Sequence, residues 1–340
     1  MNRNDMTFAD IEISNRLEKI DHVLFKIEKL VDWEAINKLL EQTDYRNSSY
    51  YGRDCYDPTK MFRVMIAQRY YNLSDREMEI QLLANFIVLK FCKFSMQDQI
   101  PDYTTICRWR KHFMEFEVFQ EAFDEIINQL ANLGIGIKNS IIIDATITES
   151  YSRPKKIETI DIEPTGDEPL QEQPQVTLTI EESKDPDARW IKKGKKCVYG
   201  YKAHTSTNKD GLINGMVTTP ANVYDGNMLQ TIVDKVSPKH KIGLYADKGY
   251  DSKSNRDFLN SKNIEDYIMR KKNLKQFAEE ERVSRNKNIS SERYVVERTF
   301  GSLKSTLGFG KSKYVGLRKT HNYNILGAML FNLIRTISIL

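Results

Sequence analysis

The chain has 340 residues, of which 40% are hydrophobic and 29% are charged, and its formal net charge is only +4. This composition is typical of a globular protein in aqueous solution, and the length allows two domains of ordinary size. The small net charge by itself excludes a strongly basic nucleic-acid-binding chain, but the charge is unevenly distributed. Residues 270–319 hold fourteen Lys and Arg against five acids, whereas residues 157–187 hold ten acids against one Lys. Such segregation predicts a polyanionic partner on one side of the molecule.

The cysteines and the two ends of the chain argue against several other classes. The four cysteines are scattered, with no C-x-x-C pair and no His at ligand spacing, so we expect no structural zinc and a reduced, cytoplasmic setting. The first fifteen residues lack the apolar segment of a signal peptide. The apolar run Tyr323–Leu340 is interrupted by two asparagines and Arg335, so it predicts a buried terminal helix rather than a membrane anchor.

The first third of the chain reads as helices. Residues 7–43 carry apolar side chains at intervals of three and four, and Asp57 followed by Pro58 is typical of a helix start. Ser74 and Glu77 form the pattern of a capping box at the start of the next helix, which we expect to run through Cys92.

A further helix is expected from Thr104 or Thr105 to Gly134, with a possible bend near Phe116, so region 1–135 is predicted to be all-helical. Two interpretations of its cations are open: they contact DNA phosphates, or they lie on ordinary solvated helix faces. The sequence pattern alone does not establish a three-helix DNA-binding motif. These cations are Arg63, Arg69, Arg76, Arg108, Arg110 and Lys111, with Trp109 among them.

From Ser140 the pattern changes to β-strands. A β-branched run begins there, and after an acidic stretch at about 155–188 that we expect to be a mobile insertion, residues 192–207 and 212–225 predict two strands joined by a turn. The remaining predicted elements are a helix to Val236, a strand over 241–247, a helix beginning at Ser252 or Ser254, a strand over 265–270 and a last helix over 291–307. This order predicts a mixed five-stranded α/β sheet with three antiparallel strands first and crossovers after them.

Three acids stand out in this region. Asp144 follows three isoleucines within the first strand, Asp247 ends the fourth strand, and Glu297 lies on the last helix. A charged residue in an apolar strand is costly unless it is paired or binds a metal, so Asp144 is either a salt-bridged or capping acid or part of a site. We expect strands one and four to be neighbours, which would bring their acids together. Three converging carboxylates favour Mg²⁺, and two such ions can flank a phosphodiester.

The last helix places Arg293, Glu297 and Lys304 within roughly 40° of one another. An apolar stripe at helical spacing runs beside them, which predicts that this face of the helix packs on a core. The stripe consists of Val296, Phe300, Leu303 and Leu307. The alternative interpretation is an ordinary surface helix with an Arg293–Glu297 ion pair.

Residues 139–340 resemble the DDE insertion-sequence transposases with a ribonuclease-H-like fold, and within them the insertion-sequence-five group. The matching segments are IIIDAT, DPDARW, GYKAHTSTNKDGLI, TTPANVYD, LYADKGYDS and RYVVERTFGSLK, and LSDREME and IPDYTTICRWR are similar to the helical region of the group. The group's helix signature is Tyr-x2-Arg-x3-Glu-x6-Lys. Arg293, Glu297 and Lys304 fit its spacing, while Ser290 stands at the Tyr position.

The resemblance implies two regions: a helical DNA-binding or dimerisation region at 1–135 and a ribonuclease-H-like catalytic domain at 139–340. It implies that Asp144, Asp247 and Glu297 are the catalytic and metal-binding acids, with Mg²⁺ as cofactor and Mn²⁺ as a substitute. The DNA-binding residues that it suggests are Arg293, Lys304, Lys202, His204, Arg298, Arg270, Lys271 and Lys272. Lys202 and His204 alternate with their neighbours, so both are candidates for the active face, although a structural role explains them equally well.

The implied activity is a transposase that cleaves the ends of an insertion element and joins the 3′-OH to target DNA by two-metal chemistry. The implied partners are double-stranded DNA (the terminal inverted repeats and the target) and a second copy of the chain, as a homodimer on DNA in a bacterial-type cytoplasm, associated with the nucleoid and not with a membrane. Two alternatives remain open: a catalytically silent DNA-binding protein derived from a transposase, and a ribonuclease-H-like nuclease without strand transfer. The acidic stretch either covers the basic surface as an autoinhibitor or is a tolerated insertion.

Overall fold

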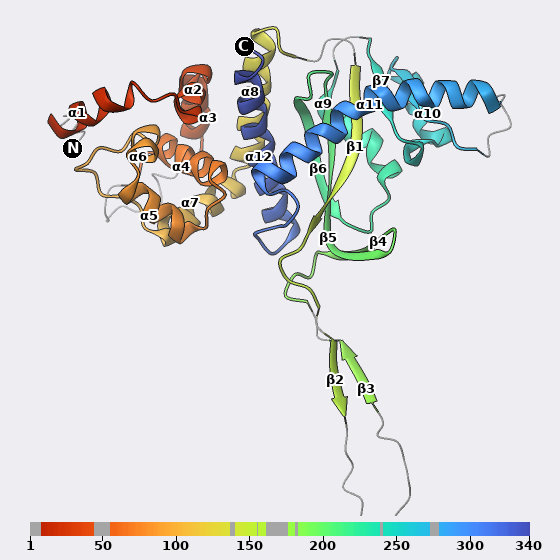
Figure 1. Cartoon of the computed structure of the whole chain (residues 1–340), viewed down its shortest axis with the longest axis horizontal. Helices are drawn as coiled ribbons and strands as arrows, with labels where there is room; N and C mark the ends of the chain where they lie inside the picture. Colours follow the sequence, from red (N-terminus) through yellow and green to blue (C-terminus); the bar gives the residue numbers. More distant parts are fainter. Residues whose placement is uncertain are drawn as a thin grey trace, which may run out of the picture.

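The computed structural model describes residues 8–43, 55–136, 140–154, 156–160, 176–180, 183–238, 241–272 and 279–340. A helical region comes first and a mixed sheet with helices on both faces follows, with α8 and α12 between them (Figure 1). The helices of the first region are α1 (Phe8–Leu17), α2 (Val23–Leu30), α3 (Trp33–Glu41), α4 (Pro58–Tyr70), α5 (Asp75–Ala84), α6 (Phe86–Phe91), α7 (Tyr103–Glu115) and α8 (Val118–Asn132).

The predicted helix starts are confirmed. The Asp57 carboxylate accepts hydrogen bonds from two backbone N–H groups of α4, with Pro58 in the first turn, and Ser74 and Glu77 form the capping box of α5. The single helix that we expected through Cys92 is divided in two, because Asn85 ends α5 and its side chain caps α6. The bend near Phe116 is a break, at which Glu117 adopts a left-handed φ of 55° before α8 begins.

The main sheet is mixed, as predicted, and has one strand more than the five that we expected. Its order is β4-β5-β1-β7-β8, with β6 paired to the other side of β5 along part of its length. β1 is antiparallel to β5 and parallel to β7, and β7 is parallel to β8, so the expected neighbours, strands one and four, are adjacent. The strands are β1 (Ser140–Glu149), β4 (Arg189–Lys193), β5 (Lys196–Thr207), β6 (Ile213–Pro220), β7 (Gly243–Ala246) and β8 (Glu265–Ile268).

The extra strand comes from a turn that we did not predict. We expected residues 192–207 to form one strand, but Gly194 adopts a φ of +61° and the chain reverses there, so Lys192 and Lys193 belong to β4. A glycine in the left-handed region is the usual requirement of a two-residue hairpin turn. The remaining helices are η2 (Asp225–Met228), α9 (Leu229–Val236), η3 (Lys248–Tyr250), α10 (Lys253–Ser261), α11 (Glu279–Leu307) and α12 (Leu317–Ile337).

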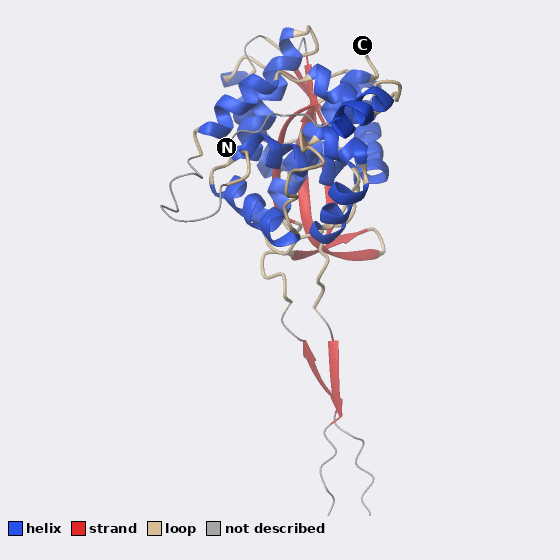
Figure 2. Cartoon of the chain, turned by 90° about the vertical axis from the view of Figure 1, so that its left-hand side faces the viewer, coloured by secondary structure: helices blue, strands red, loops and turns tan. Residues whose placement is uncertain are grey.

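The acidic stretch contains secondary structure where we expected a loop. β2 (Lys156–Ile160) and β3 (Val176–Ile180) form a two-stranded antiparallel ladder that projects away from the main sheet (Figure 2). The sequence VTLTI alternates with the period of a strand, and both segments are rich in Ile, Val and Thr, which is the signal that the proline-rich surroundings obscured. The other residues of this stretch, 161–175 and 181–182, lie outside the described residues.

The two faces of β1 pack on different cores. Ile142 packs with Ala203 and with the apolar residues of α11 and α12, whereas Ile141 and Ile143 pack with α9 and the residues around α10. Because side chains alternate along a strand, Asp144 projects on the same face as Ile142, towards α11. This alternation decides which helix can supply a partner for the Asp144 carboxylate.

Helix α12 connects the helical region to the sheet. It packs against α2, α4 and α8 and also against β6, and one hydrophobic core runs through both regions. The buried Asn332 side chain accepts a hydrogen bond from Ile213 N and donates one to Ile213 O, at 2.8 and 2.7 Å. The expected terminal helix is therefore buried, as predicted, while the division of the chain into domains at 1–135 and 139–340 stays a prediction.

Three of the cations predicted to lie along DNA or on solvated faces are instead inside the helical region. Arg63 lies 3.7 Å from the Trp33 ring centroid and donates to Phe91 O, and Arg69 lies 3.9 Å from the Tyr323 ring centroid. Arg110 pairs with Asp75 and Gln68.

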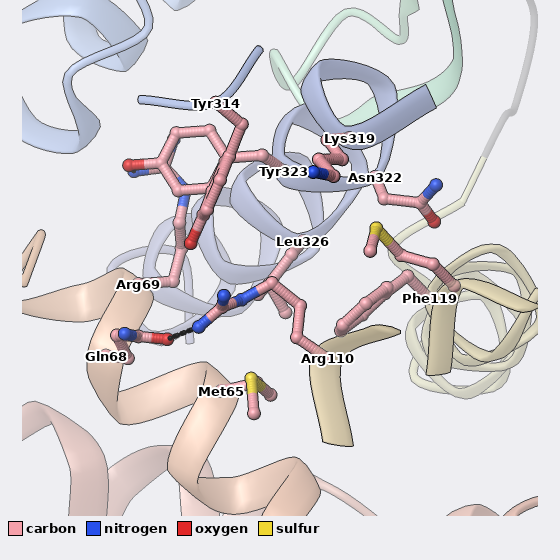
Figure 3. Close-up of a pocket in the computed structure, with 11 residues that line it drawn as sticks. Met65, Gln68, Arg69, Arg110, Phe119, Tyr314, Lys319, Asn322, Tyr323 and Leu326 are labelled. Carbon is pink, nitrogen blue, oxygen red and sulfur yellow. Dashed lines mark hydrogen bonds between the residues drawn. The ribbon is translucent and has the colours of Figure 1, made fainter. Parts of the chain in front are cut away.

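Arg69, Arg110 and Tyr323 line a cavity of about 20 Å³ where α4, α7 and α12 meet (Figure 3). This volume holds about one water molecule. These buried arginines stabilise the contact of α12 with the helical region, and burial makes them unsuitable as DNA contacts. Arg76, Arg108 and Lys111 are exposed, and Trp109 is buried.

Within the described ranges, the longest and most apolar helices still fall short of what a bilayer-spanning segment needs. This finding agrees with the prediction that the run Tyr323–Leu340 is a buried helix of the core.

We predict that Gly327→Ala lowers the free energy of unfolding by about 1–3 kcal/mol, because overpacking a full interior forces side chains apart. A Cβ at this position of α12 would lie 2.5 Å from Phe309 Cε2 and 2.7 Å from Arg69 Nη2. The matched control is Gly301→Ala in α11, where no atom lies within 4 Å of the new Cβ. This control is expected to raise the free energy of unfolding by about 0.4–1 kcal/mol. Urea denaturation followed by circular dichroism measures both, and equal effects would contradict the packing argument.

Candidate active site

The sheet brings Asp144 and Asp247 together. β1 and β7 are parallel and adjacent, with Ile143 opposite Ala246, so the next residue of each chain segment is one of the two acids. Asp247 leaves the strand there and its side chain accepts a hydrogen bond from Lys248 N at the start of η3. The prediction that the acids of strands one and four meet is therefore confirmed by the register.

The Asp144 carboxylate is costly to ionise and is held by an arginine. Burial raises the pKa of Asp144, the positive charge of Arg293 acts in the opposite direction, and the nearby negative charge of Asp247 raises the pKa further. Arg293 Nη2 donates to Asp144 Oδ2 at 2.8 Å, and both side chains are mostly buried. Two carboxylates and one guanidinium are thus brought together where β7 ends beside the middle of β1.

Helix α11 crosses the sheet on the Asp144 face and presents its apolar stripe to the core. Val296, Leu303 and Leu307 are fully buried and Phe300 nearly so, as the spacing predicted. Arg293 contacts Asp144 rather than Glu297, so the alternative of a surface ion pair within the helix is not the arrangement observed.

The structure does not bring Glu297 into the cluster. Glu297, Arg298 and Lys304 are exposed on α11. Over the described part of the chain, no three side chains of His, Cys, Asp or Glu are gathered closely enough to hold a metal ion. The assembled centre is therefore a pair of aspartates with Arg293, and Glu297 lies one helical turn beyond Arg293.

Tyr250 was not singled out by the sequence and lies beside the aspartates. It is 1% exposed, and among the described residues its hydroxyl has no hydrogen-bond partner. Burial raises the pKa of Tyr250 well above its usual value, and the charges of Asp144, Asp225 and Asp247 add to this effect. The signal in the sequence was its place three residues after Asp247, since a short turn keeps such a residue close to the strand end.

Lys202 and His204 lie on the other face of the sheet. Asp144 is opposite Thr205 in the β1–β5 ladder, so the even-numbered residues of β5 project away from the Asp144 face. Lys202 Nζ donates to Val223 O and Asp225 Oδ1, both at 2.8 Å, and the His204 ring lies 2.8 Å from Thr219 Oγ1. This corrects the expectation that the two side chains point to the active face and gives both a role in packing β5 against the segment before α9.

The basic residues after β8 are divided between interior and surface. Arg270 is buried and pairs with Asp251 at 3.2 Å and with Asp266, so its charge is compensated inside the chain. Lys271 is exposed and its Nζ donates to Asp251 O at 3.1 Å, and Lys272 is also exposed. A DNA contact by Arg270 would require the guanidinium to leave two carboxylates, which is costly for a buried group.

Two family models match the chain. The model described as "Transposase DDE domain" matches residues 137–333, and the model described as "Transposase domain (DUF772)" matches residues 12–112. The first match contains both aspartates, Tyr250 and all of α11.

Individual proteins are also similar. A "Transposase for insertion sequence element IS1106" from Neisseria meningitidis serogroup B is 33% identical over 230 residues, which cover 67% of this chain and 76% of that protein. Among solved structures, the cryo-EM structure of a piggyBac transposase synaptic complex with hairpin DNA aligns with a TM-score of 0.46 at 11% identity, over 95% of this chain and 77% of that one. The Mos1 mariner paired end complex with Mn aligns with a TM-score of 0.20 at 11% identity, over 91% and 94% of the two chains.

We predict that Asp144→Asn stabilises the protein at neutral pH. The pKa of Asp144 is raised in the folded state, so ionisation of this carboxyl costs stability, and an amide oxygen can still accept the hydrogen bond of Arg293. The difference between variant and wild type should vanish at low pH, where the carboxyl is protonated in both states. It should grow as the pH rises from the unfolded pKa through the folded one. Thermal unfolding of both proteins between pH 3.5 and 7.5 measures it, and a variant that is less stable at pH 7 would contradict the assignment.

A second prediction concerns the Tyr250 hydroxyl, which has no hydrogen-bond partner among the described residues. Tyr250→Phe should leave the free energy of unfolding unchanged or raise it by up to about 1 kcal/mol, because no hydrogen bond is lost on removing the oxygen. The matched control is Tyr201→Phe, which removes a buried hydroxyl that donates to Asp185 and should cost about 1–3 kcal/mol. Chemical denaturation of the two variants distinguishes them, and a large loss for Tyr250→Phe would reveal a partner for its hydroxyl.

Proposed function

The chain belongs to the family of transposases with a DDE domain, and from this premise we propose that it cleaves the ends of an insertion element and joins the freed 3′-OH to target DNA. The chain is thus a DNA transposase, and the residues that we propose for its catalytic centre are Asp144, Asp247 and Glu297. The observation that carries the assignment is the meeting of two acids on adjacent parallel strands, opposite an arginine from α11.

The donor chemistry of the two adjacent aspartates fits a divalent metal ion, because carboxylate oxygens are the donors that Mg²⁺ prefers. The family uses such ions, so we propose Mg²⁺ as the cofactor with Mn²⁺ as a substitute. The closeness of the Asp144 and Asp247 carboxylates, whose negative charges act on each other, supports this proposal. We propose that Asp144 and Asp247 hold the ion and that Glu297 completes the set of ligands. When bound, divalent ions polarise the phosphate and lower the pKa of water.

The remaining residues act on the DNA. Arg293 is positioned to neutralise charge that develops on a phosphate beside Asp144, and the Tyr250 hydroxyl is a buried donor without a partner among the described residues. Lys304 is exposed further along α11 and suits a contact with the DNA backbone. Arg298, Lys271 and Lys272 are exposed cations that are suited to the same role.

The proposed partners are double-stranded DNA, as terminal inverted repeats and as target, and a second copy of the chain bound to it. The excess of cations in residues 270–319 supports a polyanionic partner. A cytoplasmic location at the nucleoid follows from this function as part of the proposal.

We predict that Asp247→Asn and Glu297→Gln each reduce cleavage at the element ends by at least about a hundredfold, because each removes charge from the proposed metal centre. The assay uses purified full-length protein, Mg²⁺ or Mn²⁺, and a labelled duplex carrying the ends of the element that flanks the gene. Glu281→Gln, at an exposed acid near the start of the same helix, serves as a control that removes the same charge, and DNA binding is measured in parallel for every variant.

The outcomes separate the three candidate functions. Cleavage with 3′-OH products and joining, lost in both acid variants while DNA binding persists, supports the transposase. Binding by wild type without cutting under either metal would instead identify a silent DNA-binding protein, and cutting without joining would identify a nuclease. Full activity of Glu297→Gln would remove Glu297 from the centre and leave Asp144 and Asp247 as its acids.

A further inference from the structure

The hairpin formed by β4 and the start of β5 is the most concentrated cationic feature of the described surface. Residues 189–196, RWIKKGKK, contain five cations and no acid, and all five of these side chains are exposed. They are Arg189, Lys192, Lys193, Lys195 and Lys196. We call this segment, Arg189–Lys196, the basic hairpin.

The charges of the basic hairpin are not compensated within the described structure. None of its four lysines forms an ion pair with a described residue, and Arg189 donates only to the backbone oxygens of Pro186 and Ala188. Three acids at its base have other partners: Asp187 accepts from Leu317 N, Glu149 pairs with Arg153, and Asp185 accepts hydrogen bonds inside the base. Lys193 and Lys196 are directly opposite each other in the ladder, a placement that is destabilising for like charges. Such an arrangement is retained most easily when an external polyanion binds it.

The hairpin is held in a fixed position by its base. The Trp190 and Tyr199 rings are in contact across the ladder, with centroids 5.2 Å apart, and Tyr199 OH donates to Asp185 O at 2.8 Å. The Asp185 carboxylate is fully buried and accepts hydrogen bonds from Ser150, Tyr201 and Gly316 N. The cations are therefore presented on a stem that is tied to the end of β1 and the start of α12.

The hairpin is also linked to α11 of the proposed centre. Gly200 pairs with Arg189 on one side and with Glu149 on the other, and beside Glu149 the Thr148 hydroxyl donates to Phe309 O at 2.9 Å, two residues after α11 ends. Burial lowers the pKa of Lys304 on that helix, and the charge of Lys193 lowers it further. Lys304 belongs to the same helix as Arg293, which contacts Asp144. The positive surface thus continues from the basic hairpin to the helix that borders the aspartates.

The number of residues along β5 gives an upper limit for the distance between the basic hairpin and Asp144. Lys196 lies nine residues along β5 from Thr205, which is opposite Asp144 in the ladder. At about 3.4 Å per residue the tip of the hairpin is at most about 30 Å from Asp144. One strand of B-DNA carries a phosphate every 3.4 Å or so, which makes this span about nine base pairs.

We propose that the basic hairpin binds the phosphate backbone of duplex DNA, within about nine base pairs of the phosphodiester that is cut. The partner class, DNA, rests on the proposed function, whereas the location rests on the exposed charge of residues 189–196. The hairpin makes no base-specific contact in this proposal, because flexible ammonium groups recognise phosphate as point charges. It therefore adds affinity for any duplex and fixes the direction in which the DNA leaves the centre.

The test compares two triple variants of the full-length protein with the same loss of charge. The hairpin variant is Lys193→Gln, Lys195→Gln and Lys196→Gln. The control is Lys241→Gln, Lys253→Gln and Lys262→Gln, which are exposed lysines before β7 and around α10. The control breaks two exposed ion pairs, Lys241–Glu265 and Lys262–Asp234, which are weak because solvent screens both charges.

The measurement is the dissociation constant as a function of salt concentration, for a duplex with the element ends and for a random duplex of equal length. The hairpin variant should reduce the steepness of the log–log salt dependence by about two to three on both duplexes, and the control by less than about one. Hydroxyl-radical footprints should lose protection only within about nine base pairs of the cut, and only with the hairpin variant.

Each outcome bears on one proposal. The hairpin contact would be overturned if wild type and the hairpin variant had the same salt dependence, or if the control variant reduced the salt dependence as much as the hairpin variant. Either result would overturn it even if the wild type cuts and joins DNA. A loss confined to single-stranded DNA of the same length would also overturn it, because the proposal specifies a duplex. A hairpin-dependent footprint with a wild type that never cuts would leave the contact standing and remove the transposase activity.

Discussion

The arrangement of the site depends on one constraint: β1 has a core on each face, and Asp144 breaks the apolar pattern on the face towards α11. A carboxylate at that position must be paired, and the only large element on that face near the strand end is α11, which supplies Arg293. This pair fixes the rotation of α11, because a helix that turns Arg293 inward also turns Val296 and Leu303 into the core. The same rotation leaves Glu297 and Lys304 outward, on the side from which DNA would approach.

A second constraint is the shared core. Helix α12 cannot bury its surface on the sheet alone, because its other side packs on α2, α4 and α8. The buried arginines of the helical region belong to this contact, since Arg69 donates to Leu307 O at the end of α11 and lies against Tyr323 of α12. The helical region is thus connected mechanically to the helix that carries Arg293.

Much of the fold and part of the site could be predicted from the sequence, at the places where a residue pattern is compatible with only one local structure. Asp57–Pro58 and Ser74–Glu77 began helices as predicted, and the strand order placed Asp144 next to Asp247. The errors about the arginines have a common cause, which is that charge was assumed to mean exposure. Arg63 and Arg69 are buried against aromatic faces and carbonyl oxygens that are distant in sequence, and Arg270 is buried between Asp266, four residues before it, and the more distant Asp251. The face of Lys202 could not be assigned either, because a shift of one residue in register reverses it.

Two features of the chain that are unfavourable in isolation become consistent when they are considered together. Asp144 in the middle of β1 places negative charge where burial opposes it, next to Asp247, and the basic hairpin places like charges opposite each other without ion-pair partners among the described residues. Natural folds retain such costs mainly at functional sites, where a ligand removes them. Divalent ions would compensate the negative charge of the aspartates, and DNA phosphates would compensate the positive charge of the basic hairpin. Because β1 and β5 are paired along their length, the two features are at fixed positions on one rigid ladder. A duplex that satisfies the hairpin is thereby aligned along the strands that end in the acidic centre, so binding and positioning of the scissile phosphate are the same event.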